Sequence, residues 1–106
     1  MPFLKIDQLL HKELLPGFDA NLLHTDRMTI GHIKIAEGAI LPEHFHEHEQ
    51  VTTILSGELE MTIGGETQSC KPGDMVLIPS NTPHSARAIT ACVVMDVFQP
   101  ARDDYR

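Results

Sequence analysis

The sequence predicts an all-β domain built as a sandwich or a barrel. Short runs rich in β-branched and apolar residues recur along the chain, and turn-forming glycine, proline and asparagine residues separate them. No βαβ pattern, internal repeat or low-complexity segment interrupts this series. The chain has 106 residues, which suits one domain with one hydrophobic core.

The N-terminal part, residues 1–27, reads as a lead-in to this domain. Asp7 is expected to cap a short helical turn that ends before Pro16-Gly17. The strands and turns begin after it, so the core of the domain is expected at about residues 28–99.

Within that core the expected strands follow one another with tight turns between them. They cover residues 28–36, 49–55, 58–63, 67–70, 75–78 and 92–98. Residues 58–63 alternate acidic with apolar side chains, which is typical of a half-buried strand. Gly64-Gly65 after them suits a two-residue hairpin turn, because such a turn requires positive φ. A proline-bounded loop, residues 79–83, delivers His84 to the next strand.

Composition and charge exclude several classes of function. Hydrophobic residues make up 42% of the chain and charged residues 22%, as in ordinary soluble domains. No apolar run approaches the ~20 residues of a membrane-spanning helix, and the N-terminus lacks the pattern of a secretory signal, so a cytoplasmic protein without membrane contact is expected. The net charge of −7, without a basic stripe, argues against nucleic-acid binding. A site for an anionic substrate would therefore need local positive charge from a metal ion or arginines.

Four of the seven histidines fall in two short segments, at His44, His46, His48 and His84. On one extended strand, His44, His46, His48 and Gln50 would share a face. Two imidazoles one strand step apart can bind the same metal ion, and His84 from a distant strand would close one side of its coordination. Nitrogen and oxygen ligands suit one divalent transition metal ion such as Zn, Ni, Co, Mn or Fe. The alternative is a solvated polar strand without a metal.

Two spaced motifs favour the metal site over that alternative. The first is Gly38-x5-His44-x-His46-x3-Gln50-x6-Gly57, and the second is Gly73-x5-Pro79-x-Asn81-x2-His84. Together they resemble the two boxes of the cupin family, although that family has glutamate where this chain has Gln50, glycine where it has Asn81 and often asparagine at Ala88. The resemblance implies that residues 1–106 form a single cupin domain, a double-stranded β-helix with a jelly-roll-like barrel, that holds a metal inside and usually pairs as a homodimer.

The resemblance also implies a set of metal ligands, namely His44, His46, Gln50 and His84. A neutral amide in place of a carboxylate leaves the ion more positive and therefore a stronger Lewis acid. His48 and Glu49 compete with Gln50 for the fourth place. Gln50 itself either binds the metal or orients the substrate or a metal-bound water.

The last expected strand carries a carboxylate within an apolar run, at Asp96. Such a group is paired, has a shifted pKa or faces the barrel interior. Phe98 shares its face of the strand, and Arg102 follows four residues later. On composition alone, a structural Asp96–Arg102 ion pair or a dimer contact explains these residues.

The segment from Asp96 to Tyr105 resembles the tail of the small cupins called KdgF, the pectin and alginate degradation proteins, and both metal boxes resemble theirs too. That family implies a cytoplasmic isomerase-type enzyme. It would convert 4,5-unsaturated monouronates, anionic sugars released by pectin or alginate lyases, to open-chain 5-keto-4-deoxyuronate. By position, Asp96 would move a proton, the fork of Arg102 would clamp the substrate carboxylate, and Phe98 would line the pocket. Two alternatives stay open: a cupin dioxygenase acting on another small molecule, and a non-catalytic cupin that binds a sugar or a metal.

Overall fold

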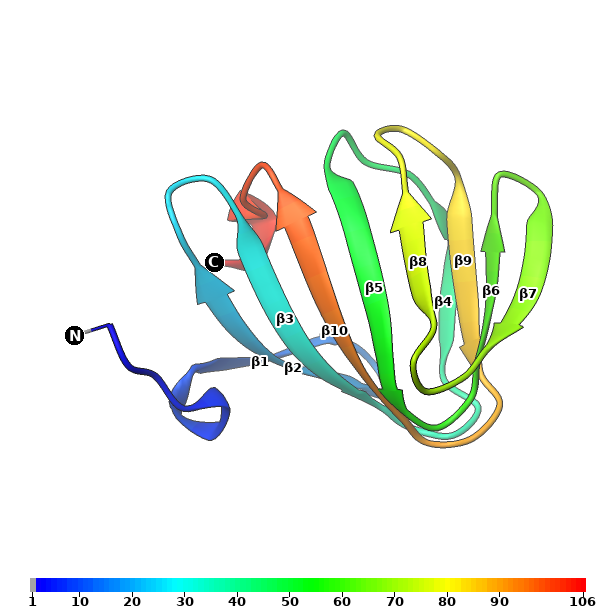
Figure 1. Cartoon of the computed structure of the whole chain (residues 1–106), viewed down its shortest axis with the longest axis horizontal. Coiled ribbons are helices and arrows are strands. Elements are labelled where there is room, and N and C mark those ends of the chain that lie inside the picture. Colours follow the sequence, from blue (N-terminus) through cyan, green and yellow to red (C-terminus); the bar gives the residue numbers. More distant parts are fainter. Residues whose placement is uncertain (1) are drawn as a thin grey trace.

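The computed structural model describes residues 2–106 and confirms the all-β class. Over these residues the chain forms ten strands and two short 3-10 helices (Figure 1). The strands are β1 (Leu10–Leu15), β2 (Phe18–His24), β3 (Thr29–Ile35), β4 (Ile40–His44), β5 (Glu49–Ser56), β6 (Leu59–Ile63), β7 (Glu66–Cys70), β8 (Met75–Ile78), β9 (His84–Ala88) and β10 (Cys92–Gln99). The 3-10 helices are η1 (Ile6–Gln8) and η2 (Asp103–Tyr105).

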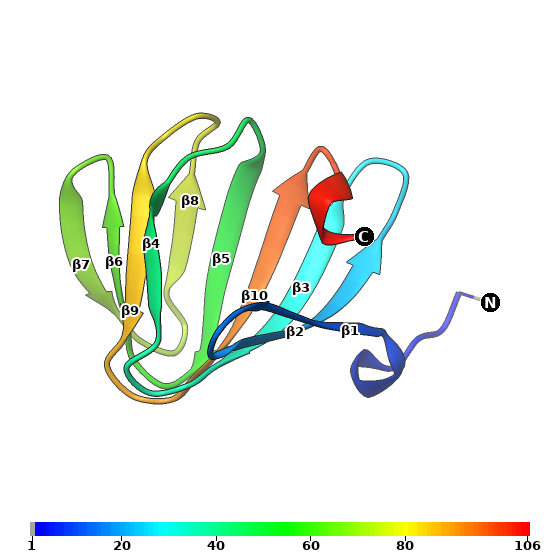
Figure 2. The same cartoon turned by 180° about the vertical axis from the view of Figure 1, so that it is seen from behind.

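The strands form two antiparallel sheets that face each other (Figures 1 and 2). One has six strands in the order β1-β2-β3-β10-β5-β8, and the other has four in the order β4-β9-β6-β7. β10 therefore lies inside the larger sheet, between β3 and β5. This arrangement is the double-stranded barrel that the sequence predicts.

Side chains alternate between the core and the outer face along β10, as the period of a strand requires. Cys92, Val94, Asp96 and Phe98 point inward and are buried, and they face inward residues of the neighbouring strands. Asp96 lies beside Thr52 of β5 in the register of the sheet. β10 thus carries one carboxylate on an inward face that is otherwise apolar.

The N-terminal region differs from the expected lead-in. β1 and β2 form a hairpin that extends the larger sheet, and Phe18, Ala20 and Leu22 of β2 belong to the core. A 3-10 turn does form, but Asp7 lies inside it, and the cap position has no side-chain hydrogen bond. The apolar residues of β2 alternate with Asp19 and Asn21, a period of two that predicts a strand.

The turn of this hairpin requires glycine at position 17. Gly17 has φ +86°, and a Cβ there would lie 2.8 Å from the Cβ of Ala39. The hairpin can therefore pack closely against the segment that leads into β4.

Among the described residues, no helix is long and apolar enough to cross a membrane.

Candidate metal centre

Three imidazoles from separate parts of the fold converge at one end of the barrel. His44 ends β4, His46 lies in the loop after it, and His84 begins β9. His44 and His84 are opposite each other in the β4–β9 pairing. One ring nitrogen from each of the three residues lies within 4.8 Å of the others. A group of three imidazoles this close together could hold one metal ion.

Backbone carbonyl groups orient all three rings in the same way. The Nδ1 atom of His44 lies 2.9 Å from the carbonyl oxygen of Pro42, that of His46 3.0 Å from that of His48, and that of His84 2.8 Å from that of Thr82. A carbonyl only accepts hydrogen bonds, so each Nδ1 carries a proton, and in the neutral ring Nε2 then has a free lone pair. Among the described residues, the Nε2 atoms of His46 and His84 are buried without a hydrogen-bond partner.

These orphaned nitrogens fit a divalent metal ion. Buried polar atoms are normally hydrogen-bonded, so an unpartnered pair beside a third imidazole indicates a missing ligand. Burial, and then the positive charge of Arg102 and the neighbouring His84 ring, lower the pKa of His46 to about 4. Burial also lowers the pKa of His84. Both rings are therefore neutral at pH 7, the form that binds a metal, and their bonded Nδ1–H groups match the outer-shell contacts of known metal-binding histidines.

The segment between His44 and Gln50 is not the continuous strand that the sequence predicts. β4 ends at His44, a bend follows at residues 47–48, and β5 begins at Glu49. The shared face inferred from alternation is therefore wrong, and His48 lies outside the group of three. The ring of His48 lies 5.4 Å from that of His46, while its backbone carbonyl orients His46.

Gln50 is buried, whereas its competitor Glu49 is exposed. The Nε2 of Gln50 donates to the Oγ1 of Thr52 over 2.9 Å, and Thr52 donates to the Oδ1 of Asp96 over 2.6 Å. The single hydroxyl proton of Thr52 goes to the carboxylate, so its oxygen must accept from the amide nitrogen. The amide orientation is thereby set, and the Oε1 of Gln50 is the atom left for a metal or a substrate.

Asp96 is 8% exposed and has no ion pair with Arg102 in the described part of the chain. Burial raises its pKa to about 6, although hydrogen bonds from Thr52 and Gln50 and the charge of Arg102 act in the opposite direction. The structural Asp96–Arg102 ion pair, one of the two alternatives from composition alone, is thus not formed among the described residues. The carboxylate instead has a pKa near the pH at which proton transfer in both directions is efficient.

Arg102 has a different partner, Asp104, which sequence reasoning missed. Its Nε and Nη2 donate to the two carboxylate oxygens of Asp104 over 2.9 and 2.7 Å. Its guanidinium carbon lies 4.8 Å from the centre of the Phe98 ring and 4.0 Å from that of Tyr105. No periodic pattern marks Asp104 or Tyr105, because the tail after β10 is irregular.

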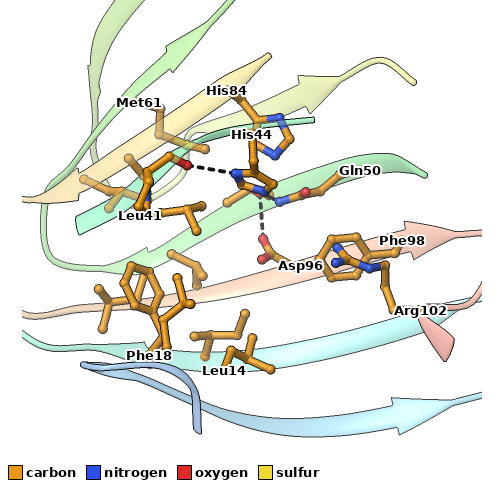
Figure 3. Close-up of a pocket in the computed structure, with 18 of the residues that line it drawn as sticks. Leu14, Phe18, Leu41, His44, Gln50, Met61, His84, Asp96, Phe98 and Arg102 are labelled. Atoms are coloured by element: carbon orange, nitrogen blue, oxygen red, sulfur yellow. Dashed lines mark hydrogen bonds between the residues drawn. The ribbon is translucent and has the colours of Figure 1, made fainter. Parts of the chain in front are cut away.

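A cavity of about 390 Å³ joins these groups. Its polar lining includes His44, Gln50, His84, Asp96 and Arg102, with Phe98 beside them (Figure 3). Apolar side chains such as Leu14, Phe18 and Leu41 line the rest of it (Figure 3). The cavity therefore combines imidazoles whose Nε2 atoms can bind a metal, a carboxylate of raised pKa and a guanidinium. This set is suited to acid–base chemistry on a small anionic molecule.

Comparisons with known proteins agree with this geometry. The pectin degradation protein KdgF of Dickeya dadantii (strain 3937) is 28% identical over 102 residues, which cover 93% of each chain. The structure of KdgF from Halomonas sp. matches with a TM-score of 0.91 at 29% identity, over 100% of this chain and 99% of that one. An RmlC-like cupin from Shewanella frigidimarina NCIMB 400 matches with a TM-score of 0.93 at 25% identity, over 100% and 96% of the two chains.

The family model of the cupin domain matches residues 31–98. This range runs from β3 to β10 and contains the three converging histidines, Gln50 and Asp96. The chain belongs to the cupin family.

Proposed function

We propose that this protein is a metal-dependent enzyme that converts 4,5-unsaturated monouronates to open-chain 5-keto-4-deoxyuronate. The observation that carries the proposal is the meeting of metal-ready histidines, a buried carboxylate and a guanidinium in one cavity. The similarity to KdgF, named a pectin degradation protein, supports a substrate derived from pectin. The cavity volume of about 390 Å³ accommodates a molecule of this size.

The Nε2 atoms of His44, His46 and His84 would hold one divalent ion, with the Oε1 of Gln50 as a fourth donor. When bound, the ion supplies a Lewis acid that stabilises negative charge on substrate oxygens. It also supplies local positive charge, which an anionic substrate needs near a chain of net charge −7.

The proposed reaction is an isomerisation, with no net oxidation. The anomeric hydroxyl loses its proton, the bond between the anomeric carbon and the ring oxygen breaks, and the ring oxygen takes up a proton, so that an aldehyde and an enol form. The carbon at position 4 then gains a proton and the enol loses one, which leaves the 5-keto group. One group that can accept and return a proton serves both the ring opening and the tautomerisation.

Asp96 is that group. Its pKa of about 6 leaves it mainly ionised at pH 7, so it can accept the anomeric proton and later return one. Thr52 holds its Oδ1, so Oδ2 is the oxygen available to the substrate. A positioned acid–base group of this kind contributes roughly 10²–10⁴-fold to the rate.

Arg102 would bind the substrate carboxylate through the end of its guanidinium that Asp104 leaves free. Asp104 occupies the edge formed by Nε and Nη2, so a clamp on the substrate would use Nη1 and the second N–H of Nη2. Within the described part of the chain, Nη1 is buried and has no partner. Phe98 supports the guanidinium rather than standing alone as a pocket wall.

The test is a turnover assay on purified protein loaded separately with Zn, Ni, Co, Mn and Fe. Loss of the ultraviolet absorbance of a lyase-made unsaturated monouronate should exceed the spontaneous rate, without oxygen uptake, and a chelator should abolish the gain. His11→Ala, which removes an exposed histidine that does not line the cavity, is a matched control that should keep full activity. No acceleration with any of the five metals refutes the proposal, and metal-dependent oxygen uptake would point to a dioxygenase instead.

The homodimer and the cytoplasmic location stay predictions. Leu55, Met75 and Leu77 project from the outer face of β5 and β8 and are 46%, 68% and 60% exposed. Contiguous exposed apolar side chains are typical of protein contacts, so these residues offer a surface for a second copy. Light scattering of the purified chain measures its mass, and the mass of a single chain would exclude the dimer.

A further inference from the structure

The guanidinium of Arg102 is restrained on nearly every side. Asp104 accepts hydrogen bonds from Nε and Nη2, and the rings of Phe98 and Tyr105 lie 4.8 and 4.0 Å from its central carbon. Cation–π contacts of this kind hold a planar cation against an aromatic face. The guanidinium therefore has one preferred place beside the cavity, although the arginine stem is long and flexible.

The backbone of Arg102 is restrained as well. Its amide donates to the Oγ1 of Thr29 over 2.8 Å, and Thr29 is fully buried at the start of β3. The Oγ1 of Thr29 lies 2.8 Å from the Nδ1 of His24 at the end of β2. The irregular tail is thus attached to two strands of the larger sheet where it passes the cavity.

These contacts leave one nitrogen of the guanidinium without a partner. Nη1 of Arg102 is buried and makes no hydrogen bond to any residue from 2 to 106, and the side chain is only 8% exposed. A buried, unpartnered N–H₂ group of a cation is costly, so it indicates a ligand atom that is supplied from outside the chain. Arg102 lines the cavity that also contains His44 and Asp96, which gives that ligand atom a location.

We propose that Asp104 is a positioning residue, which occupies the Nε/Nη2 edge of the Arg102 guanidinium so that its Nη1 end meets the substrate anion. The identity of that anion rests on the proposed function, whereas the positioning does not. Asp104 also balances the charge of Arg102, so the pair fixes the direction of the hydrogen bond to the anion and the metal site supplies the net positive charge. Substrate recognition by Arg102 is then confined to one end of the guanidinium.

The first test observes the guanidinium directly. Nitrogen-15 NMR of the arginine side chains should show separate, slowly exchanging Nη signals for Arg102 in the wild-type chain, because the hydrogen bonds to Asp104 and the two aromatic rings hinder rotation of the group. Asp104→Asn should merge or broaden these signals. Asp103→Asn is the matched control, since Asp103 is the neighbouring acid of η2 and, within residues 2–106, its side chain pairs with the exposed Arg106 instead of Arg102.

The second test uses kinetics in a double-mutant cycle. Asp104→Asn should lower kcat/KM about 10- to 100-fold, the range expected when a charged hydrogen-bonded pair is broken, whereas Asp103→Asn should change it less than twofold. In an Arg102→Ala background, Asp104→Asn should cause no further loss. Asp104→Glu, which keeps the carboxylate, should recover part of the activity. Circular dichroism of each variant separates these effects from loss of fold.

The outcomes separate this inference from the proposed function. Restrained Arg102 signals that Asp104→Asn releases, in a chain without turnover, would keep the positioning role and reject the uronate reaction. Signals that are equally mobile in wild type and Asp104→Asn would overturn the positioning role even in an active enzyme. Equal losses from Asp104→Asn and Asp103→Asn, or additive losses with Arg102→Ala, would overturn it as well.

Discussion

Two sides of the cavity hold their functional groups by different means. The histidines are oriented by backbone carbonyls of Pro42, His48 and Thr82, which any residue at those positions would supply. Arg102 is oriented by the side chains of Asp104, Phe98 and Tyr105, which only particular residues supply. The first arrangement depends on the path of the chain and the second on residue identity, so substitutions should affect the two sides differently.

The largest expected effect comes from removing a ligand on the histidine side. His84→Ala should reduce bound metal from about one ion per chain to a small fraction and reduce turnover to the spontaneous rate, because a three-nitrogen set loses its buried member. Metal analysis after dialysis, together with the absorbance assay, measures both. His11→Ala should retain metal and activity. Full metal occupancy in His84→Ala would show that His84 is not needed to hold the metal.

Asp96 should show a loss of turnover without a loss of metal. Asp96→Asn keeps the shape of the side chain but cannot accept a proton, so kcat should fall roughly 10²–10⁴-fold. Metal content and far-ultraviolet circular dichroism should match the wild type, since Asp96 is not one of the three converging ligands. Near-full activity in Asp96→Asn would remove Asp96 from the mechanism.

The same contrast explains what could be predicted from the sequence. Groups held by the backbone recur at fixed spacings, so His44, His46 and His84 are recognisable from the sequence alone, and the strands around them follow from turns and alternation. Asp104 and Tyr105 lie in an irregular tail where neither the strand period nor the helix period applies. Their contact with Arg102 is therefore seen only in the three-dimensional structure. Strand β2 could have been predicted, since its apolar residues alternate with polar ones.

Alternation failed at His48 for a physical reason. Parity along the chain predicts a shared face only while the chain stays extended. The bend before Glu49 breaks that condition, so the histidines converge through strand pairing and a loop.

The pKa of Asp96 predicts how the stability of the metal-free protein changes with pH. The folded chain keeps the Asp96 proton up to about pH 6, whereas the unfolded chain loses it near the ordinary value of 3.8. The unfolded state therefore binds fewer protons between these values. The contribution of Asp96 to the free energy of unfolding should fall by about 3 kcal/mol as the pH rises from below 4 to above 6.

The lowered pKa of His46 acts in the opposite direction over much of that range, so the useful quantity is a difference. Urea unfolding of wild type and Asp96→Asn at a series of pH values isolates the Asp96 part. The wild type should lose stability relative to the variant as the pH rises. Parallel pH profiles for the two proteins would show that the carboxyl does not titrate as its burial implies.

The smallest expected effect lies on the side held by side chains. Tyr105→Leu removes the aromatic face 4.0 Å from the guanidinium carbon of Arg102 but leaves the hydrogen bonds to Asp104. A cation–π contact is worth about 1 kcal/mol, so kcat/KM should fall roughly fivefold, mainly through KM, while metal content stays unchanged. Tyr105→Phe keeps the ring and should remain close to wild type in both measurements. If Tyr105→Leu instead releases the metal, the two sides of the cavity are one coupled unit, and the separation between backbone-held and side-chain-held groups does not describe this protein.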